Sequence, residues 1–313
     1  MQPIRVFIDG EAGTTGLQIR DRLVGRAEFR LVSLDPARRK DVSARAEAMA
    51  SSDVAVLCLP DEAAREAVAL AATLPGGGPR LLDASTAHRI AEGWVYGFPE
   101  LSPDQPAAIA QARRVANPGC YPTGAIALLR PLVDAGLIPP DFPLTINAVS
   151  GYSGGGRSMI EAYEKGEAPA FELYGLGLEH KHLPEIMRYA GLARRPIFVP
   201  SVGNFRQGML VSIPLHLDAL PGRPSAADLE AALAARYRGA AFVSVVAAAG
   251  LARLDAEALN GSNRLELFVF RNEAHRHAVL VARLDNLGKG AAGAAVQNLE
   301  TMFGLVPVEP VLA

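Results

Sequence analysis

The sequence predicts an α/β protein with two domains. The first is a Rossmann-type dinucleotide-binding domain, and the second is an α+β catalytic domain with a mixed or antiparallel sheet. At 313 residues the chain is long for one core. Strand–helix units follow one another in the first half, and the second half contains several short strands, one of them with an alternating pattern at residues 144–149. We expect residues 1–117 and 285–313 to form the dinucleotide-binding domain, and residues 118–284 the catalytic and dimerisation domain.

Composition excludes several classes of protein. The formal net charge is -2 and the isoelectric point about 6.3, which argues against a nucleic-acid or membrane-surface partner. No apolar run approaches the roughly 20 residues that a membrane span needs, and no signal peptide is expected at the N-terminus. The two cysteines predict a reducing, cytoplasmic location, with Cys58 buried in a strand and Cys120 a free thiol.

The first strand is expected at residues 4–9, and the helix after it through about residue 26. A glycine-rich loop joins them: Gly10, Gly13, Thr14, Thr15 and Gly16 belong to the run Gly-Glu-Ala-Gly-Thr-Thr-Gly. Amide groups at the start of a helix point at an anion. A tight structural turn and a phosphate site both fit this spacing, and its position between strand and helix favours the phosphate.

The second strand, at residues 29–34, carries the signal for the choice of cofactor. Asp35 near its end would favour NAD, whereas a basic cluster suits the extra phosphate of NADP. Ser33 together with Arg38, Arg39 and Lys40 favours NADP. The alternative is a solvated basic turn.

Two more strands are expected at residues 54–59 and 80–83, with a helix at 61–72 between them. In open α/β sheets the ligand lies beyond the carboxyl ends of the strands. Ser85 and Arg89 follow the strand 80–83 and are therefore placed to meet cofactor or substrate. Arg89 suits a bidentate contact with a phosphate, unless it pairs with Glu92 at the surface.

Residues 117–124 read Asn-Pro-Gly-Cys-Tyr-Pro-Thr-Gly, between a strand end at 113–116 and an apolar helix at 125–132. Pro122 suits the first helical turn, so Cys120 lies at a helix N-terminus, where the macrodipole favours a thiolate. A buried structural cysteine would also fit a Pro/Gly turn, but the motif around Cys120 favours a nucleophile.

A strand at residues 144–149 leads into the loop 150–157 and a short helix at 158–165. Ser150, Gly151, Ser153 and Arg157 give this loop hydroxyls, flexible backbone and a cation, which suit an anionic substrate better than a linker.

Residues 179–186 contain the second chemical cluster. Pro184 marks a helix start, so His182 lies near its N-cap, where the positive helix end keeps the ring neutral. Glu185 lies on the same face and can orient a ring or the substrate. His180 and His182 have strand-type metal spacing, but a third ligand is missing, and we expect no metal.

The remaining chain predicts an α+β arrangement. We expect residues 197–201 and 209–216 to be paired strands, with Arg206 in the loop that joins them. A helix follows at 225–237 with Ser225 as its N-cap. Further strands are expected at residues 242–246, 264–270 and 277–284, and a helix rich in small residues begins near 285.

The motif around Cys120 resembles the active-site motif of N-acetyl-gamma-glutamyl-phosphate reductases, in the semialdehyde-dehydrogenase superfamily. His-x-His-x-Pro-Glu at residues 180–185, Ser-x-x-x-Arg at 85–89 and Tyr-Gly-x-Pro-Glu at 96–100 match the same family. The length and the first loop look like the shorter, type 2 form. The resemblance runs from residue 4 to about 299 and implies a homodimer or homotetramer.

The resemblance also implies roles for single residues. His182 handles protons, residues 96–100 form a structured lid or interface loop, and the final helix returns to the first domain to line the nicotinamide pocket. The implied catalytic set is Cys120, His182 and Glu185. The implied cofactor-binding set is Gly10, Gly13, Thr14, Thr15, Gly16, Ser33, Arg38, Ser85, Asn286 and Gly288. The implied substrate-binding set is Arg89, Asn117, Ser150, Gly151, Ser153, Arg157, His180 and Arg206.

The implied reaction is NADPH-dependent reduction of N-acetyl-gamma-glutamyl phosphate, through a thioester on Cys120, in arginine biosynthesis. Three alternatives stay open on the sequence. Aspartate-semialdehyde dehydrogenase shares the chemistry, a related reductase acts on a carrier-linked lysine precursor, and a non-catalytic nucleotide sensor would have lost turnover. The joint presence of Cys120, His182 and Glu185 argues against the last.

Overall fold

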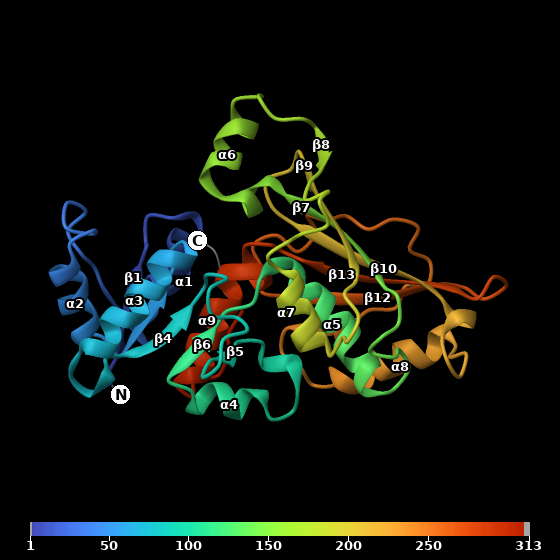
Figure 1. The fold of residues 1–313 in the computed structure, drawn as a ribbon, viewed down its shortest axis with the longest axis horizontal. Coiled ribbons are helices and arrows are strands. Elements are labelled where there is room, and N and C mark those ends of the chain that lie inside the picture. The colour runs from blue at the N-terminus through green and yellow to red at the C-terminus, as the bar shows by residue number, and fades with distance from the viewer. Residues whose placement is uncertain (1, 310–313) are drawn as a thin grey trace. The chain divides into compact units, whose positions relative to one another are not determined.

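The computed structural model describes residues 2–309, which divide into two compact units. The first comprises residues up to Pro99, Asp104–Pro118 and the segment from Ala291 onward. The second comprises Glu100–Pro103 and Gly119–Gly290. Residues 285–290 therefore pack with the second unit. Figure 1 shows the elements of each unit along the chain.

The first unit is a doubly wound α/β fold around a parallel sheet of order β2-β1-β3-β4-β6-β5. Every pair of neighbouring strands in it is parallel. The strands are β1 Ile4–Asp9, β2 Phe29–Val32, β3 Val54–Leu57, β4 Arg80–Asp83, β5 Val95–Tyr96 and β6 Arg114–Ala116. The helices are α1 Thr14–Leu23, α2 Val42–Ala50, α3 Asp61–Thr73, α4 Gln105–Gln111 and α9 Gly293–Met302, with the 3₁₀ turns η1 Pro75–Gly77 and η2 Pro99–Leu101.

Helices cover both faces of this sheet because its strands are apolar on both sides, as parallel strands are. One core joins α1 and α9 to β1, β3, β4 and β6 through residues such as Ile19, Val56 and Leu299. The other core joins α2 and α3 to the opposite face through Met49, Ala67 and Leu57. The carboxyl ends of β1, β2, β3 and β4 thus share one edge of the sheet.

The second unit is built on a mixed sheet of order β11-β12-β13-β10-β7-β9-β8. Its strands are β7 Thr145–Gly151, β8 Phe171–Leu173, β9 Ile197–Gly203, β10 Met209–His216, β11 Val243–Val245, β12 Leu265–Asn272 and β13 His277–Leu284. Its helices are α5 Cys120–Asp134, α6 Gly156–Glu164, α7 Leu183–Ala190 and α8 Ala226–Arg236, with the 3₁₀ turns η3 Tyr152–Gly155 and η4 Leu217–Ala219. A π-helical turn, η5 Gly288–Ala292, precedes α9.

The apolar helix α5 is the centre of this unit. It packs against α7 and α8 and against strands β10, β12 and β13. Gly124 permits this close approach, because a Cβ there would lie 2.9 Å from a methyl group of Val211 on β10. Tight packing fixes the start of α5, and with it Cys120, against the sheet.

The structure confirms the predicted fold class and most of the predicted elements. The strand β13 has the predicted bounds, Pro122 lies in the first turn of α5, and His182 is the N-cap of α7. Ser225 caps α8 in a capping box with Asp228. The final helix begins later than predicted, because residues 285–287 form a turn and η5 follows.

The predicted pairing of residues 197–201 with 209–216 is wrong. Strand β7 lies between β9 and β10, parallel to the first and antiparallel to the second. The connecting loop crosses the end of β7 and is tied to it: the amide of Tyr152 donates to the carbonyl of Phe205, and that of Ser153 donates to Arg206. Nearness in sequence suggested a hairpin, but the buried strand β7 takes the place between them.

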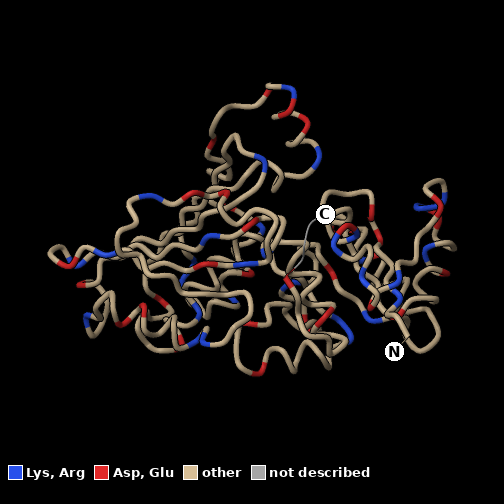
Figure 2. The backbone as a smooth tube through the Cα atoms, turned by 180° about the vertical axis from the view of Figure 1, so that it is seen from behind, with Lys and Arg blue, Asp and Glu red and all other residues tan. Residues whose placement is uncertain are grey.

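None of the described helices combines the length and apolar character that crossing a membrane requires. Acidic and basic residues are interspersed along the backbone of both units, as Figure 2 shows. Two of the apolar side chains that remain exposed, Phe171 and Leu173, lie on the short edge strand β8.

Candidate active site

Cys120 is the first residue of α5 and is half-buried. Gly119, the N-cap, is extended (φ −78°, ψ 154°), and no side chain caps the helix from that residue. Instead, the amide of Gly119 donates to Oε1 of Glu185, 2.8 Å away. A carboxylate from α7 thus takes up a donor beside the helix start, while the positive end of α5 favours a thiolate at Cys120.

The second element of the site is the start of α7. Pro184 fits the first turn because it needs no hydrogen-bond partner for its nitrogen. Glu185 is 1% exposed and His182 6% exposed, so both lie inside the unit. The amide of His182 donates to Nδ1 of His180, 3.2 Å away. Burial, and then the charge of Lys181, lowers the pKa of His180 to about 4, so its ring is neutral at pH 7.

Aromatic rings enclose the two histidines. The ring centroids of His180 and His182 lie 4.7 Å apart, and Tyr121 lies 6.0 and 5.9 Å from them. Phe198 of β9 lies 5.1 Å from His180, and Tyr174 lies 5.8 Å from it. Ring edges and faces meet at steep angles, an arrangement that fixes ring orientation.

A short chain of hydroxyl groups runs through the same region. Tyr174 donates to the hydroxyl of Tyr121 at 3.2 Å, and Tyr121 donates to the carbonyl of Ser201 at 3.1 Å. Burial raises the pKa of Tyr121, and raises that of Tyr174 to about 12, so both hydroxyls keep their protons. Sequence reasoning missed both tyrosines, although adjacency to Cys120 was a signal for Tyr121.

The site therefore gathers Cys120, His180, His182 and Glu185 in the second unit. A surface cavity of about 340 Å³ adjoins it and shares His180; its lining is Glu179, His180, Lys181, Leu183, Pro184, Met187 and Arg195. Cys120 is absent from that lining. We therefore place the chemistry at the start of α5 rather than in this cavity.

A second polar cluster lies where β7 ends. Asn286 donates to Oγ of Ser153 at 2.9 Å and accepts from the amide of Gly208 at 2.8 Å. The hydroxyl of Ser150 donates to the carbonyl of Gly151 at 3.0 Å. These groups are buried, and they brace the loop 204–208 against the end of β7.

The glycines in this part of the second unit are required by close packing. A Cβ on Gly288 would lie 2.0 Å from the carbonyl oxygen of Ser262, and one on Gly151 would lie 2.7 Å from that of Arg206. Asn286 and Gly288, predicted to bind cofactor, thus have packing and bracing roles that the sequence did not reveal.

The two predicted substrate arginines of this unit are exposed. Arg206 pairs with Glu164 of α6 at 2.8 Å, and the two side chains are 58% and 50% exposed. Arg157 is exposed in the first turn of α6. An exposed ion pair contributes little stability, so the Arg206 guanidinium can exchange Glu164 for another anion at small cost.

In the first unit the glycine-rich loop is a tight turn between β1 and α1. Gly10 has φ +89°, and a Cβ there would lie 2.2 Å from the carbonyl oxygen of Cys58. A Cβ on Gly16 would lie 2.5 Å from the carbonyl of Gly10. Gly13 is the extended N-cap of α1 without a side-chain cap, and Thr14 and Thr15 open the helix. This donor set suits a phosphate.

The residues predicted to select NADP over NAD follow β2. Ser33 is exposed, and residues 36–40 form an exposed turn. The carboxylate of Asp35 accepts from the amide of Ala37 at 2.8 Å, which holds the turn. Arg38 is about half-exposed, with Nη2 3.8 Å from Oδ1 of Asp41. The cluster of Arg38, Arg39 and Lys40 is thus solvated and open to a ligand.

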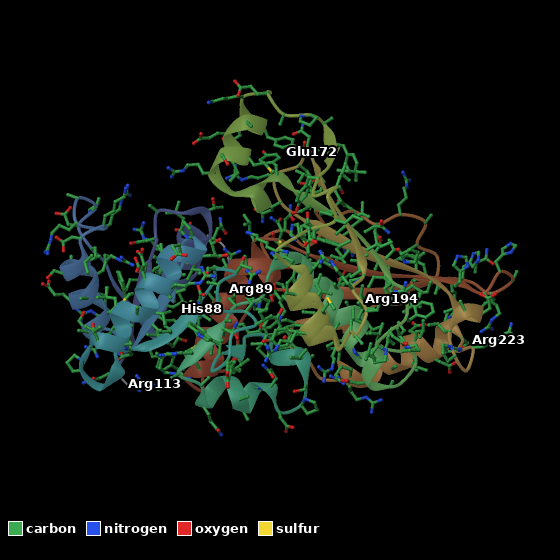
Figure 3. The ribbon with its side chains drawn as sticks, in the orientation of Figure 1. His88, Arg89, Arg113, Glu172, Arg194 and Arg223 are labelled. Atoms are coloured by element: carbon green, nitrogen blue, oxygen red, sulfur yellow. The ribbon has the colours of Figure 1, made fainter. Side chains whose placement is uncertain are left out.

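A buried polar network follows β4. Asp83 accepts from the hydroxyl of Ser85 at 2.8 Å and contacts Nδ1 of His88 at 2.6 Å. The His88 ring stacks on Trp94 at 4.3 Å. Sequence reasoning predicted Ser85 but missed Asp83 and His88, although Asp83 ends a strand at the ligand edge. Figure 3 labels His88 and Arg89.

The structure brings Arg89 and Asn117 together. The guanidinium of Arg89 is buried and donates to the carbonyl of Asn117 at 3.0 Å. Asn117 in turn donates to the carbonyl of Ala291 and accepts from Asn298, each at 3.0 Å. Arg89 therefore helps to shape the loop that leads toward Cys120. Nothing in the sequence singled out Asn298.

Among the described residues no group of three or more His, Cys, Asp or Glu side chains is arranged to hold a metal ion. The Cys58 and Cys120 thiols are both unbridged.

Comparison with known proteins points to one family. Residues 120–286 match the family model of the semialdehyde dehydrogenase dimerisation domain. The chain is 57% identical over 305 residues to N-acetyl-gamma-glutamyl-phosphate reductase 2 of Pseudomonas putida, covering 96% of both chains. It is 56% identical to N-acetyl-gamma-glutamyl-phosphate reductase of a Chelativorans species, covering 96% of this chain and 98% of the other.

A solved structure shares the fold. It is the aspartate semialdehyde dehydrogenase of Candida albicans with NADP, which is 14% identical with a TM-score of 0.62 and covers 96% of this chain and 98% of that one. At this identity the likeness concerns the fold alone.

Proposed function

The chain belongs to the family of N-acetyl-gamma-glutamyl-phosphate reductases, and we propose that it catalyses the reaction in their name. It would reduce N-acetyl-gamma-glutamyl phosphate to N-acetylglutamate semialdehyde, with NADPH as reductant and release of phosphate, in arginine biosynthesis. The observation that carries the proposal is the grouping of Cys120, His182 and Glu185 at two facing helix starts.

In the first step the Cys120 thiolate attacks the acyl carbon. The carbon–sulfur bond forms as the acyl–phosphate bond breaks, so phosphate leaves and a thioester remains on Cys120. The positive end of α5 stabilises the attacking thiolate. Glu185 holds the amide of Gly119 and so keeps the turn before Cys120 in one conformation.

Proton transfer falls to His182. Its position at the N-cap of α7 favours the neutral ring in the resting enzyme. A neutral imidazole is free to accept the proton of the thiol. When NADPH is bound, it supplies the hydride that reduces the thioester to a thiohemiacetal. Collapse of that adduct frees the aldehyde and regenerates the thiol, with His182 again handling the proton.

The first unit suits NADPH. Gly10 and Gly16 let the loop pack tightly against neighbouring backbone, and the start of α1 would offer amides to the diphosphate. Ser33 and Arg38 would face the phosphate on the ribose, and Ser85 would lie beside the cofactor at the end of β4. Arg89, Asn117, Ser150, Ser153, Arg157 and Arg206 remain the proposed substrate contacts.

We further propose a cytoplasmic location and a homo-oligomeric assembly. Two unbridged thiols fit a reducing cytoplasm. The match to a dimerisation-domain family supports a homodimer or homotetramer.

The decisive experiment compares Cys120→Ser with Cys58→Ser. Cys120→Ser should lose reduction of N-acetyl-gamma-glutamyl phosphate altogether while it still binds NADPH, because an alcohol at neutral pH cannot replace the thiolate. Cys58→Ser should remain active if it folds. Activity would be assayed in the phosphate-dependent reverse direction with N-acetylglutamate semialdehyde. Aspartate semialdehyde, assayed in the same way, would test the competing substrate. Near-normal turnover by Cys120→Ser would end the covalent mechanism.

A further inference from the structure

The second unit contains a buried ion pair that the proposed chemistry does not use. Lys289 is 0% exposed, and its Nζ lies 2.8 Å from Oε1 of Glu100. The Glu100 side chain is 8% exposed. The ammonium group also lies 5.5 Å from the ring centroid of Phe242. Removing two charges from water is unfavourable, so a pair at such depth calls for a reason beyond stability.

The backbone beside Lys289 touches the proposed nucleophile. A Cβ built on Gly290 would lie 2.9 Å from Cβ and 3.3 Å from Cα of Cys120. On its other side, a Cβ on Gly288 would collide with the carbonyl of Ser262. Lys289 thus stands between two glycines that are pressed against neighbouring chain, one of them against Cys120. The segment is a π-helical turn, a form often found at functional sites.

Other contacts also hold this segment: Asp285 at its beginning, and Asn117, which donates to the carbonyl of Ala291, near its end. The carboxylate of Asp285 accepts from Gln207 at 2.7 Å and from the amide of Gly261 at 2.8 Å. The amide of Gly290 donates to the carbonyl of Asp285 at 3.0 Å. Lys289 is the charged anchor nearest to Gly290, and Glu100 comes from a part of the chain 189 residues away.

We propose that the Lys289–Glu100 ion pair is a positioning device for Cys120: it holds the backbone of Gly290 against the Cys120 Cβ and thereby limits the directions that the thiol can take. This inference rests on the proposed role of Cys120 as nucleophile. Lys289 is a positioning residue, because its side chain points to Glu100 and acts on Cys120 only through Gly290.

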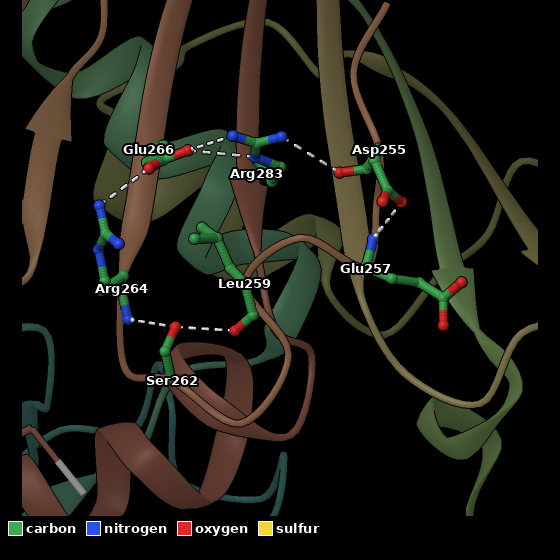
Figure 4. A network of polar contacts seen from close by, with 7 residues as sticks. All are labelled: Asp255, Glu257, Leu259, Ser262, Arg264, Glu266 and Arg283. Atoms are coloured by element: carbon green, nitrogen blue, oxygen red, sulfur yellow. Dashed lines mark hydrogen bonds and ion pairs between the residues drawn. The ribbon is translucent and has the colours of Figure 1, made fainter. Parts of the chain in front are cut away.

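The test uses the full chain and four variants. Lys289→Met and Glu100→Gln each break the charge pair, Lys289→Arg keeps the charge, and Lys289→Met/Glu100→Met replaces both charges by apolar groups. The matched control is Arg283→Met, which breaks the pair between Arg283 and Glu266 across β12 and β13 in the same unit, with atoms 2.5 Å apart (Figure 4).

Two readouts are taken below the unfolding temperature of each variant. The first is the rate of Cys120 alkylation by iodoacetamide as a function of pH; burial raises the pKa of the partly exposed Cys58 thiol and slows its reaction. The second is kcat and KM for the acyl phosphate. Displacing a reacting group by about 1 Å costs up to about 10²-fold in rate. We therefore expect Lys289→Met to lower kcat between about tenfold and 10²-fold, with KM within about twofold.

The inference predicts that the alkylation profile changes in Lys289→Met, returns toward wild type in Lys289→Arg, and is unchanged in Arg283→Met. The double variant should regain thermal stability but neither kcat nor the alkylation profile. Recovery of kcat together with stability in the double variant would show that the pair is structural only, and so would an unaltered alkylation profile in Lys289→Met. Should Lys289→Met fail to fold, Glu100→Gln decides by the same criteria. Alkylation needs no turnover, so failure of the proposed function, seen in Cys120→Ser, is distinct from failure here.

Discussion

Two helices of this protein begin in the same way and differ in what surrounds their first turn. Both α1 and α5 have an extended glycine as N-cap, with φ and ψ of −79° and 162° at Gly13 and −78° and 154° at Gly119, and neither residue supplies a side-chain cap. Gly13 is exposed, whereas Gly119 is buried and its amide is held by the carboxylate of Glu185.

The difference separates two uses of one local structure. An open helix start offers its amides to a ligand from outside, such as a phosphate. A helix start enclosed by the protein's own carboxylate has a fixed geometry and serves the residue placed on it, here Cys120. We expect ligand binding at the start of α1 to depend on charge and salt. We expect the reaction at the start of α5 to depend on side-chain shape and protonation.

The largest effect is expected in the enclosed region, at His182. His182→Asn should slow the chemical steps by about 10²–10⁴-fold, the usual range for a general acid or base. NADPH affinity should change little, because the proposed phosphate site is the loop Gly10–Gly16. Single-turnover measurement of thioester formation and hydride transfer provides the check.

His180→Asn is the control for that prediction. The His180 ring accepts a backbone amide and is neutral, so it has a different environment from its neighbour. A large defect in His180→Asn without one in His182→Asn would reverse the assignment. Normal rates in both would mean that another group or water moves the proton.

The role of the open start of α1 is tested by adding a carboxylate to it. Gly13→Asp gives α1 a carboxylate of its own, as α5 has from Glu185. A Cβ at this position would lie 3.3 Å from the carbonyl of Gly10, so the loop can accept it with a small shift. Asp is a favoured N-cap, so the helix should remain stable, while repulsion weakens NADPH binding at least about tenfold.

Fluorescence titration with NADPH measures this loss. Gly177→Asp adds the same charge in the second unit, at an exposed glycine whose Cβ would meet nothing within 4 Å. Equal affinities of Gly13→Asp and Gly177→Asp would refute the view that α1 receives the cofactor phosphates.

A smaller effect is expected beyond β2. Replacing Arg38, Arg39 and Lys40 by Ala should reduce the preference for NADPH over NADH by about tenfold, because three exposed charges contribute roughly 0.5 kcal/mol each. The preference should also weaken in high salt. Kd values for both cofactors give the answer, with Arg194→Ala in the second unit as control. Equal losses for NADPH and NADH would identify a merely solvated turn.

A further prediction concerns the dependence of stability on pH. The unfolded chain takes up a proton on His180 near the ordinary pKa of 6.5, whereas the folded chain does so only near 4. Between these values the unfolded state binds more protons, so the free energy of unfolding falls as the pH is lowered from 6.5 to 4. His180→Asn should remove up to about 1.4 kcal/mol per pH unit of that slope. Denaturant titrations of both proteins at pH 7, 6, 5 and 4.5 compare the slopes; parallel curves would contradict the prediction.

Local signals in the sequence were sufficient for much of the fold. Pro122 and Pro184 indicate where α5 and α7 begin, because proline is favoured in a first turn, although α5 also contains Pro131 in its interior. The strand expected at residues 277–284 has the bounds observed for β13. Strand order was a different matter: no local signal places β7 between β9 and β10, since that order depends on which apolar faces are buried together.

The site divides in the same way. The positions of Cys120 and His182 at helix starts could be predicted, because a proline lies in the first turn of each helix. Glu185 was predicted to orient a ring or the substrate, and the structure shows its carboxylate on the amide of Gly119, 66 residues away. Tyr174 and Lys289 act through partners distant in sequence, Tyr121 and Glu100, and neither pair has a sequence pattern.

The crossing of backbones at Gly10 and Gly16 has a consequence for mutational scanning. Any side chain at these positions meets a carbonyl oxygen at 2.2 or 2.5 Å, so a saturation library selected for growth should lose nearly every variant at both codons. Gly288 should show the same depletion, although it belongs to the second unit. Gly25, which has open space around it, should retain variants of the residue types that tolerate its φ of +81°. Depletion at a glycine codon therefore measures steric exclusion in this protein, and functional residues are better sought among depleted positions that carry a side chain.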